Sequence, residues 1–127
     1  MRHSREYFSP QDYKSSPLGR MAHDGWINRA EYEAGDRWRE VYIGYLRTIG
    51  APDPYGCDDE ALSAMPDDVC EKYARRYRDG VKILERCGKR VLHAVNAIAV
   101  YGEPDELADF EYTAKAAKVG LAALAKG

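Results

Sequence analysis

The chain lacks the short motifs that commonly mark an enzyme. It has no GxSxG nucleophile turn, no GxxxxGK[ST] phosphate loop, no HExxH zinc helix, no DxDxDG loop and no GxGxxG turn. Two carboxylate pairs stand at helical spacing, Asp36 with Glu40 and Glu106 with Asp109. Each pair has basic neighbours or lies near a helix end, as is usual on a solvated helix face. We therefore expect no enzymatic activity.

Metal ligands and disulfide partners are also scarce. The chain has three cysteines and three histidines, and no CxxC or HxxxC spacing occurs. A zinc site gathers three or four such ligands. An odd number of cysteines is typical of a protein in a reducing compartment. We expect no metal, no cofactor and a cytoplasmic location.

No apolar run is long enough to cross a membrane. The longest candidate, 91–101, is interrupted by His93 and Asn96, whereas a membrane helix needs about 18 or more apolar residues. The opening residues, Met1 to Glu6, lead into no apolar stretch of the kind that directs secretion. We expect neither secretion nor a membrane partner.

Positive and negative charges nearly cancel, but they are sorted along the chain. Among 127 residues, 19 are basic and 21 acidic, which gives a net charge of −2. The segment 51–68 has six acidic and no basic side chains, and 69–101 has eight basic and three acidic ones. The total excludes a nucleic-acid-binding protein that is basic all over. The basic centre of the chain is the candidate contact region.

Helical signals recur along the chain, and no segment alternates as a strand would. Asn28 and Glu31 have the spacing of a capping box, and apolar residues three and four apart follow as far as Ile49. Gly50 has the place of a left-handed C-terminal cap, and Pro66 opens a second long helix. With 45% hydrophobic residues, the chain is predicted to be all-α, a single compact domain of about five helices.

This single domain is predicted to take up the whole chain, 1–127. In chain order it comprises a tail at 1–15, N-terminal helices within 16–50, an acidic loop at 51–68, and a basic helix with a further helical end in 69–127. Trp38 lies in the middle of the best amphipathic stripe. We expect it to be buried between the 29–49 helix and the long central helix.

The basic residues of the central block follow a helical period. Positions 75, 78, 82, 86 and 89 stay near one side of a helix, beside an apolar line that faces the core. Such a row suits a phosphate backbone or an acidic protein surface. The alternative is an ordinary solvated face, partly neutralised by nearby carboxylates. The candidate contact residues are Arg75, Arg78, Lys82, Arg86, Lys89 and Arg90.

The C-terminal part has the order of a helix-turn-helix. Glu106-Leu107-Ala108 would end a first helix, 109–112 would form the turn, and Thr113 would cap a second helix. This order, closed by Leu121-Ala122-Ala123-Leu124, resembles the DNA-binding module of sigma-factor region 4 and of response-regulator-type activators. The resemblance implies that Lys115 and Lys118 touch phosphates or bases. A plain pair of core helices is the alternative, because the second helix has no Arg, Asn or Gln to read base edges.

The chain as a whole resembles small phage and prophage proteins of alphaproteobacteria, including those of gene-transfer-agent type. The pattern lies in 16–21 (SPLGRM), 25–27 (GWI), 31–39 (EYEAGDRWR) and 118–125 (KVGLAALA). The resemblance implies a cytoplasmic transcription activator or antiterminator, similar in role to lambdoid Q proteins. Within the pattern, Gly35 indicates close helix packing and Trp38 a core anchor.

Three functions are compatible with the sequence. The first is a phage- or prophage-type transcription regulator acting on double-stranded DNA, on bacterial RNA polymerase or on both. The second is a protein-interaction module, an inhibitor or assembly factor, with Trp26, Tyr42 and Tyr45 as an exposed aromatic patch. The same aromatic residues could instead belong to the core. The third is a phage protein that handles DNA, such as a packaging subunit. We favour the first, with a partner supplying the specificity that phosphate contacts lack.

Overall fold

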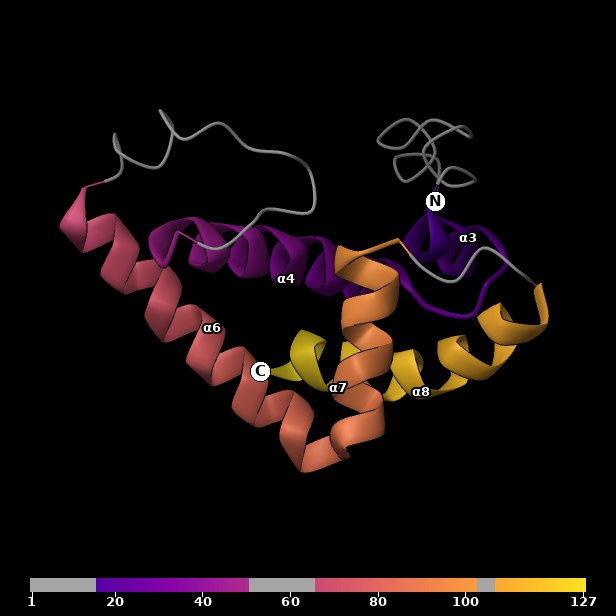
Figure 1. Cartoon of the computed structure of the whole chain (residues 1–127). Coiled ribbons are helices and arrows are strands. Elements are labelled where there is room, and N and C mark those ends of the chain that lie inside the picture. The colour runs from indigo at the N-terminus through magenta and orange to yellow at the C-terminus, as the bar shows by residue number, and fades with distance from the viewer. Residues whose placement is uncertain (1–15, 51–65, 103–106) are drawn as a thin grey trace.

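Five helices surround a common core in the computed structural model, which describes residues 16–50, 66–102 and 107–127 (Figure 1). These three stretches contain no strand, so the all-α fold predicted from the sequence is confirmed. In chain order the helices are α3 (Pro17–His23), α4 (Arg29–Thr48), α6 (Asp67–Cys87), α7 (Lys89–Val95), continued by the π-helical turn η1 (Asn96–Val100), and α8 (Leu107–Lys126).

The ends of α3 and α4 follow the local sequence. The Ser16 hydroxyl accepts a hydrogen bond from the backbone N–H of Gly19 at 3.0 Å. The N–H of Glu31 donates to the Asn28 side chain at 2.8 Å, and the N–H of Asn28 donates to the Glu31 carboxylate at 2.9 Å. This is the predicted capping box. Gly50 follows α4 with φ +67°, the left-handed conformation expected there.

The helices α6 and α7 form a V whose corner is Gly88 (Figure 1). Gly88 has φ +121°, and no atom lies within 4 Å of the place its Cβ would occupy. The glycine is therefore required by the direction of the backbone and not by close packing. The long helix α6 ends at this glycine, and α7 begins directly after it.

The last helix, α8, passes behind α7 and ends between the arms of the V (Figure 1). It packs against α4, α6 and α7. Its backbone lies close to α7, since a Cβ at Gly120 would be 2.5 Å from Cγ2 of Val95. The fully buried face of α8 repeats every three or four residues and consists of Phe110, Ala114, Ala117 and Leu121.

The predicted helix-turn-helix is wrong in its placement. The helix α8 is continuous, so 109–112 is helical and Thr113 lies inside the helix. Phe110 and Ala114 are buried four residues apart, 1% and 0% exposed, which holds this segment to the core as one helix. No glycine or proline occurs between 107 and 119. Glu106, part of the predicted first helix, lies outside the described residues.

Trp38 is buried between α4 and α6, as the sequence predicts, with 4% of its surface exposed. Its ring edge rests on Gly80, where a Cβ would overlap the indole. Gly35 brings α4 equally close to α8, because a Cβ there would be 2.9 Å from Cδ2 of Leu121. Two glycines thus place α4 against both of its main neighbours, and the close packing expected at Gly35 is confirmed.

Helix α6 begins directly after Pro66, as predicted, so the acidic loop predicted at 51–68 extends two residues too far. Asp67 and Asp68 belong to the first turn of α6 and not to a loop, where their charges favourably face the positive end of the helix dipole. The predicted tail, 1–15, and the rest of the acidic segment, 51–65, lie outside the described residues. Among the helices described, none is both long and apolar enough to span a membrane.

Candidate nucleic-acid interface

The outer face of α6 carries four of the predicted contact residues. We define the basic face of α6 as Arg75, Arg78, Lys82 and Arg86, all of which are exposed. Leu84 and Gly80 lie on the opposite side of the helix and are buried. The spacing along the sequence places the four cations within about 16 Å of helix, at about 1.5 Å per residue. The predicted outward orientation is thus observed.

The cations of α6 keep their hydrogen-bond donors uncommitted. In the stretches that the structure describes, no ion pair engages Lys72, Arg75, Arg76, Arg78, Lys82 or Arg86. On α4, by contrast, Arg29 pairs with Glu33 at 3.2 Å and Arg39 pairs with Asp36 at 2.9 Å. The acidic residues Glu71, Asp79 and Glu85 of α6 are exposed. The face has both the charge and the donors that a phosphate group requires.

Lys89 and Arg90 do not continue the row. The chain turns at Gly88, so both residues begin α7, and the prediction of one continuous stripe is wrong beyond Arg86. Lys89 is exposed near the corner. The guanidinium carbon of Arg90 lies 4.4 Å from the ring centroid of Tyr112 on α8. This cation–π contact joins α7 to α8 and commits one face of the guanidinium.

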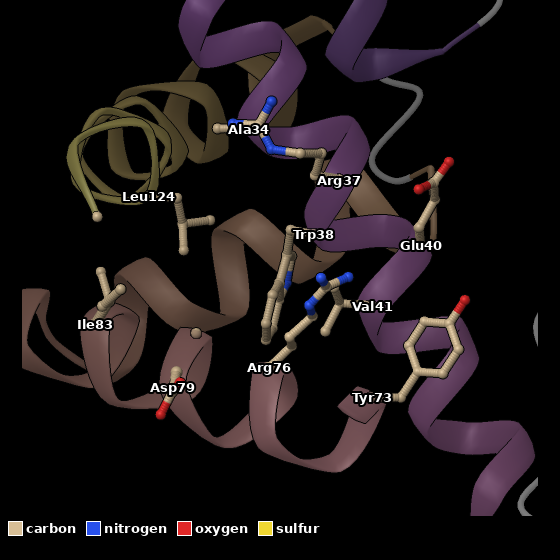
Figure 2. Close-up of a pocket in the computed structure, with 12 residues that line it drawn as sticks. Ala34, Arg37, Trp38, Glu40, Val41, Tyr73, Arg76, Asp79, Ile83 and Leu124 are labelled. Carbon is tan, nitrogen blue, oxygen red and sulfur yellow. The ribbon is translucent and has the colours of Figure 1, made fainter. Parts of the chain in front are cut away.

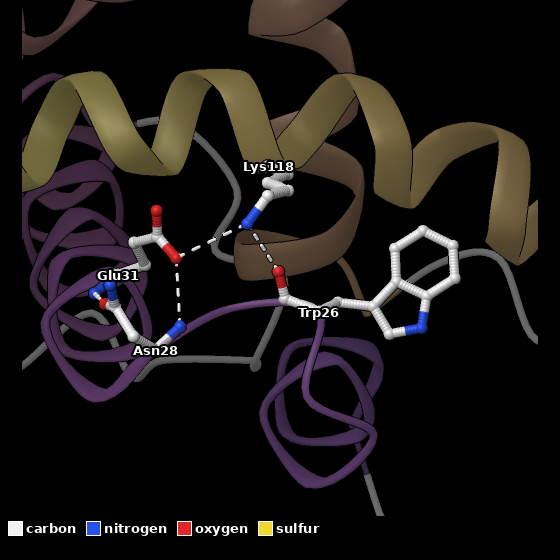
Figure 3. A network of polar contacts seen from close by, with 4 residues as sticks. All are labelled: Trp26, Asn28, Glu31 and Lys118. Atoms are coloured by element: carbon white, nitrogen blue, oxygen red, sulfur yellow. Dashed lines mark hydrogen bonds and ion pairs between the residues drawn. The ribbon is translucent and has the colours of Figure 1, made fainter.

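Lys118 ties α8 to the beginning of α4 (Figure 3). Its Nζ donates to the carbonyl oxygen of Trp26 at 2.7 Å and lies 3.8 Å from Oε1 of Glu31. The same carboxylate oxygen accepts the N–H of Asn28 in the capping box. Half of the Lys118 side chain is exposed. Lys118 therefore has an internal structural contact that the helix-turn-helix interpretation did not anticipate.

Lys115 lies one helical turn before Lys118 and is exposed. No hydrogen bond or ion pair engages it within the ranges described. Of the two lysines that the sequence assigned to a recognition helix, only Lys115 has its charge available to an external partner. Because no base-reading side chain accompanies it on α8, it is suited to a phosphate contact.

A groove of about 450 Å³ lies between α4, α6 and the end of α8 (Figure 2). Arg37 and Glu40 of α4 and Arg76 and Asp79 of α6 supply charge to its walls, beside the small exposed part of Trp38. Arg37, Arg76 and Asp79 are not among the contact residues predicted from the sequence. Each arginine directly precedes an aromatic residue in the sequence, which is only a weak sequence signal for a site. These side chains come together only because α4, α6 and α8 pack against one another.

The aromatic residues of the proposed interaction patch are packed together and do not form an exposed patch. Tyr45 stacks on Tyr77 with ring centroids 4.0 Å apart, and Tyr77 stacks on Trp38 at 5.8 Å. Tyr42 meets Tyr77 edge to face at 5.7 Å. The last of the three predicted residues, Trp26, is half-buried against Phe110. The hypothesis of a protein-interaction module therefore loses its proposed contact surface, because these aromatic side chains pack against one another and against the core.

Burial also changes the ionisation of this aromatic cluster. It raises the pKa of the Tyr42 hydroxyl well above its ordinary value, and a hydrogen bond to the Tyr101 hydroxyl at 3.0 Å adds to the effect. Burial likewise raises the pKa of Tyr77, with a smaller contribution from Tyr45. Both hydroxyls stay neutral at physiological pH. They add no charge to the neighbouring surface.

The described stretches contain no group of three or more histidine, cysteine or acidic side chains placed to hold a metal ion. Cys70 and Cys87 are each partly buried, and the Cys87 thiol lies 3.5 Å from the carbonyl oxygen of Ile83. The candidate contact features of the described surface are the basic face of α6, the exposed Lys89 and Lys115, and the groove. No protein-family model, no curated protein and no solved structure matches this chain.

Proposed function

We propose that this protein is a small phage- or prophage-type transcription regulator that binds nucleic acid through the basic face of α6. The observation that carries the proposal is the row of four exposed arginine and lysine side chains without ion-pair partners in the described stretches. Cations that are already uncommitted need not break internal pairs before they meet phosphates. Binding releases the counterions condensed on the nucleic acid, and this release drives association.

The charge of the rest of the molecule limits what this face does alone. The whole chain is slightly acidic, so attraction is local to the basic face of α6 and to the exposed Lys89 and Lys115. Phosphate contacts position a protein on nucleic acid without reading its sequence. We therefore propose that target choice comes largely from a partner, the bacterial RNA polymerase, in the cytoplasm of the host.

The resemblance to phage regulators supports the transcription part of this proposal. The absence of the predicted turn in α8, together with the internal contact of Lys118, favours work on a transcription complex over action as a lone operator-binding repressor. An activator and an antiterminator both fit this description. Each must contact the nucleic acid and also present a surface that binds the polymerase.

The contact between α6 and nucleic acid is tested by removing two cations from this helix. Arg75→Ala combined with Arg86→Ala should weaken binding to unrelated double-stranded DNA sequences. It should also flatten the log–log salt dependence by about 1.8, at about 0.9 per lost phosphate contact. Fluorescence anisotropy over a salt series beginning near about 50 mM measures both effects.

The matched control is Arg29→Ala with Arg39→Ala, which removes the same charge from α4. These two arginines form intramolecular ion pairs, so their loss should leave the salt slope unchanged. Equal effects of the two double variants would contradict a defined face. No DNA binding by the unmodified protein at low salt would contradict the proposal as a whole.

The partner is tested by affinity purification from a bacterial host lysate. Polymerase subunits in stoichiometric amounts would support the proposal, and their recovery should survive nuclease treatment. Tight, sequence-selective operator binding by the purified protein, with no polymerase recovered, would overturn the partner-dependent mechanism.

A further inference from the structure

We propose that the groove between α4, α6 and the end of α8 binds one unpaired guanine, as a free nucleotide or within a single strand. This inference rests on the proposed nucleic-acid function and deepens it. It supplies a base-reading site, which the side chains of α8 do not provide. Three features of the groove support it: its size, charged side chains of both signs in its walls, and its continuity with the basic face of α6.

The groove has the size and the walls that a flat base requires. Its volume of about 450 Å³ lies within the roughly 300–1,000 Å³ usual for small-ligand sites. Leu124 and Ile83 line one side and Trp38 lines the other (Figure 2). A base inserted there would lay one face on Leu124 and Ile83 and would meet the small part of Trp38 that is exposed, 4% of its surface. Its edges would be left for polar groups.

Arg37 of α4 and Asp79 of α6 are among the four charged side chains that line this space; the others are Glu40 of α4 and Arg76 of α6 (Figure 2). Guanine offers the acceptors O6 and N7 on one edge and the donors N1–H and N2–H₂ on another. Arginine binds O6 and N7 through two parallel hydrogen bonds, and a carboxylate accepts from adjacent N–H groups. Adenine places a donor where guanine has O6, so it would leave the arginine unsatisfied.

Neither of these side chains is committed elsewhere in the part of the chain described. Arg37 and Asp79 form no hydrogen bond and no ion pair there. Their neighbours on α4 behave differently, since Asp36 and Arg39 pair with each other at 2.9 Å. A ligand that presents acceptors on one edge and donors on another would satisfy both groups at once. A simple anion or a simple cation would satisfy only one.

The groove also joins the basic face of α6. Arg76 lines the groove and is exposed. Lys72 lies one helical turn before it, on the same flank of the helix. A nucleotide with its base in the groove would therefore meet cations where its phosphate leaves. A single strand could continue from there along the basic face of α6.

The base preference is tested with short single strands that differ at one central position within an otherwise uniform pyrimidine sequence. Fluorescence anisotropy should show about tenfold tighter binding with guanine at that position than with adenine, cytosine or uracil. Arg37→Ala should remove this preference. Arg78→Ala is the matched control on the outer face of α6, and it should weaken all four strands equally.

Asp79→Asn gives a sharper test because charge and recognition then act in opposite directions. Loss of the negative charge should strengthen binding to every strand, while loss of the carboxylate acceptor should reduce the preference for guanine. A variant that was merely less stable would not bind every strand more tightly while losing the preference for guanine. Thermal melting of each variant in the absence of ligand checks that the fold is retained.

Free nucleotide is tested separately by titrating guanosine monophosphate and following the two indole N–H resonances by NMR. The resonance of Trp38 should move, and that of Trp26, which does not line the groove, should stay. Movement with the strand but not with the mononucleotide assigns the site to single strands. Equal affinity for all four strands, with no movement of Trp38, would overturn this inference. The proposed function would still stand if duplex binding depended on the basic face of α6.

Discussion

The indole N–H of Trp38 donates a hydrogen bond to the side-chain oxygen of Asn96 at 2.8 Å, across 58 residues of sequence. Asn96 is the first residue of η1, the π-helical turn that follows α7. A π turn widens the helix locally and turns side chains away from the usual α-helical direction. This contact fixes the ring of Trp38. The ring stacks on Tyr77 in the aromatic cluster, and the residue also lines the groove.

We expect Asn96→Leu to lower the free energy of unfolding by about 1–3 kcal/mol. The substitution leaves the buried indole N–H without its acceptor, and an unsatisfied buried donor costs about this much. Chemical denaturation measures the change. In the Trp38→Phe background the donor is absent, so the same Asn96→Leu substitution should cost clearly less. An equal cost in both backgrounds would show that the hydrogen bond contributes nothing.

Gly80→Ala should destabilise the protein although alanine is the better helix former. Propensity alone favours alanine by about 1 kcal/mol, but its Cβ would overlap the ring of Trp38. Overpacking of this kind costs typically about 1–3 kcal/mol. Trp38→Leu removes the overlapping ring, so Gly80→Ala introduced after it should be neutral or stabilising. A higher melting temperature for Gly80→Ala alone would mean that α4 and α6 do not meet there.

Lys118→Ala should cost about 1 kcal/mol of stability, whereas Lys115→Ala should cost almost nothing. Lys118 donates to the Trp26 carbonyl and lies near Glu31, but its half-exposed side chain limits the contribution because solvent screens the charge. Lys115 serves as the matched control one turn away. For nucleic acid the order should reverse, with Lys115→Ala weakening binding more than Lys118→Ala does.

Alkaline conditions should unfold the protein through its tyrosine cluster. Burial, with the hydrogen bond to Tyr101, raises the pKa of Tyr42 above its ordinary value of 10.0, so the folded state retains a proton that the unfolded state loses. The stabilisation from this group is fully present below about pH 10 and is lost as the pH rises above it. Denaturation curves over this range should show a steeper loss for the wild type than for Tyr42→Phe. Identical slopes would contradict the buried hydroxyl.

Several features of the fold follow from short stretches of sequence. The capping box of Asn28 and Glu31 and the left-handed Gly50 are local, because each depends on hydrogen bonds or backbone angles within one turn. The outward orientation of Arg75 and Arg86 follows equally directly from the helical period and from the apolar line opposite them. Such features were predictable residue by residue.

The π turn at Asn96 and the continuity of α8 were not predictable in this way. The segment 109–112 has the polarity of a turn, yet Phe110 fills a fully buried position in the core and keeps the segment helical. The prediction failed because tertiary packing outweighs weak local preference. The contact of Lys118 with Trp26 joins residues 92 apart in the sequence, and no local pattern could predict it.

By its sequence alone this chain determines an all-α protein, the ends of its first helices, its buried Trp38 and a basic outer face on its central helix. These depend on periodicity and capping, which act within a few residues. Tertiary structure decided that the chain turns at Gly88, that Arg90 and Lys118 serve internal contacts, and that Arg37 and Asp79 line one groove. Those outcomes depend on which helices pack together and at which glycines they come close, and such contacts are formed only between residues distant in the chain.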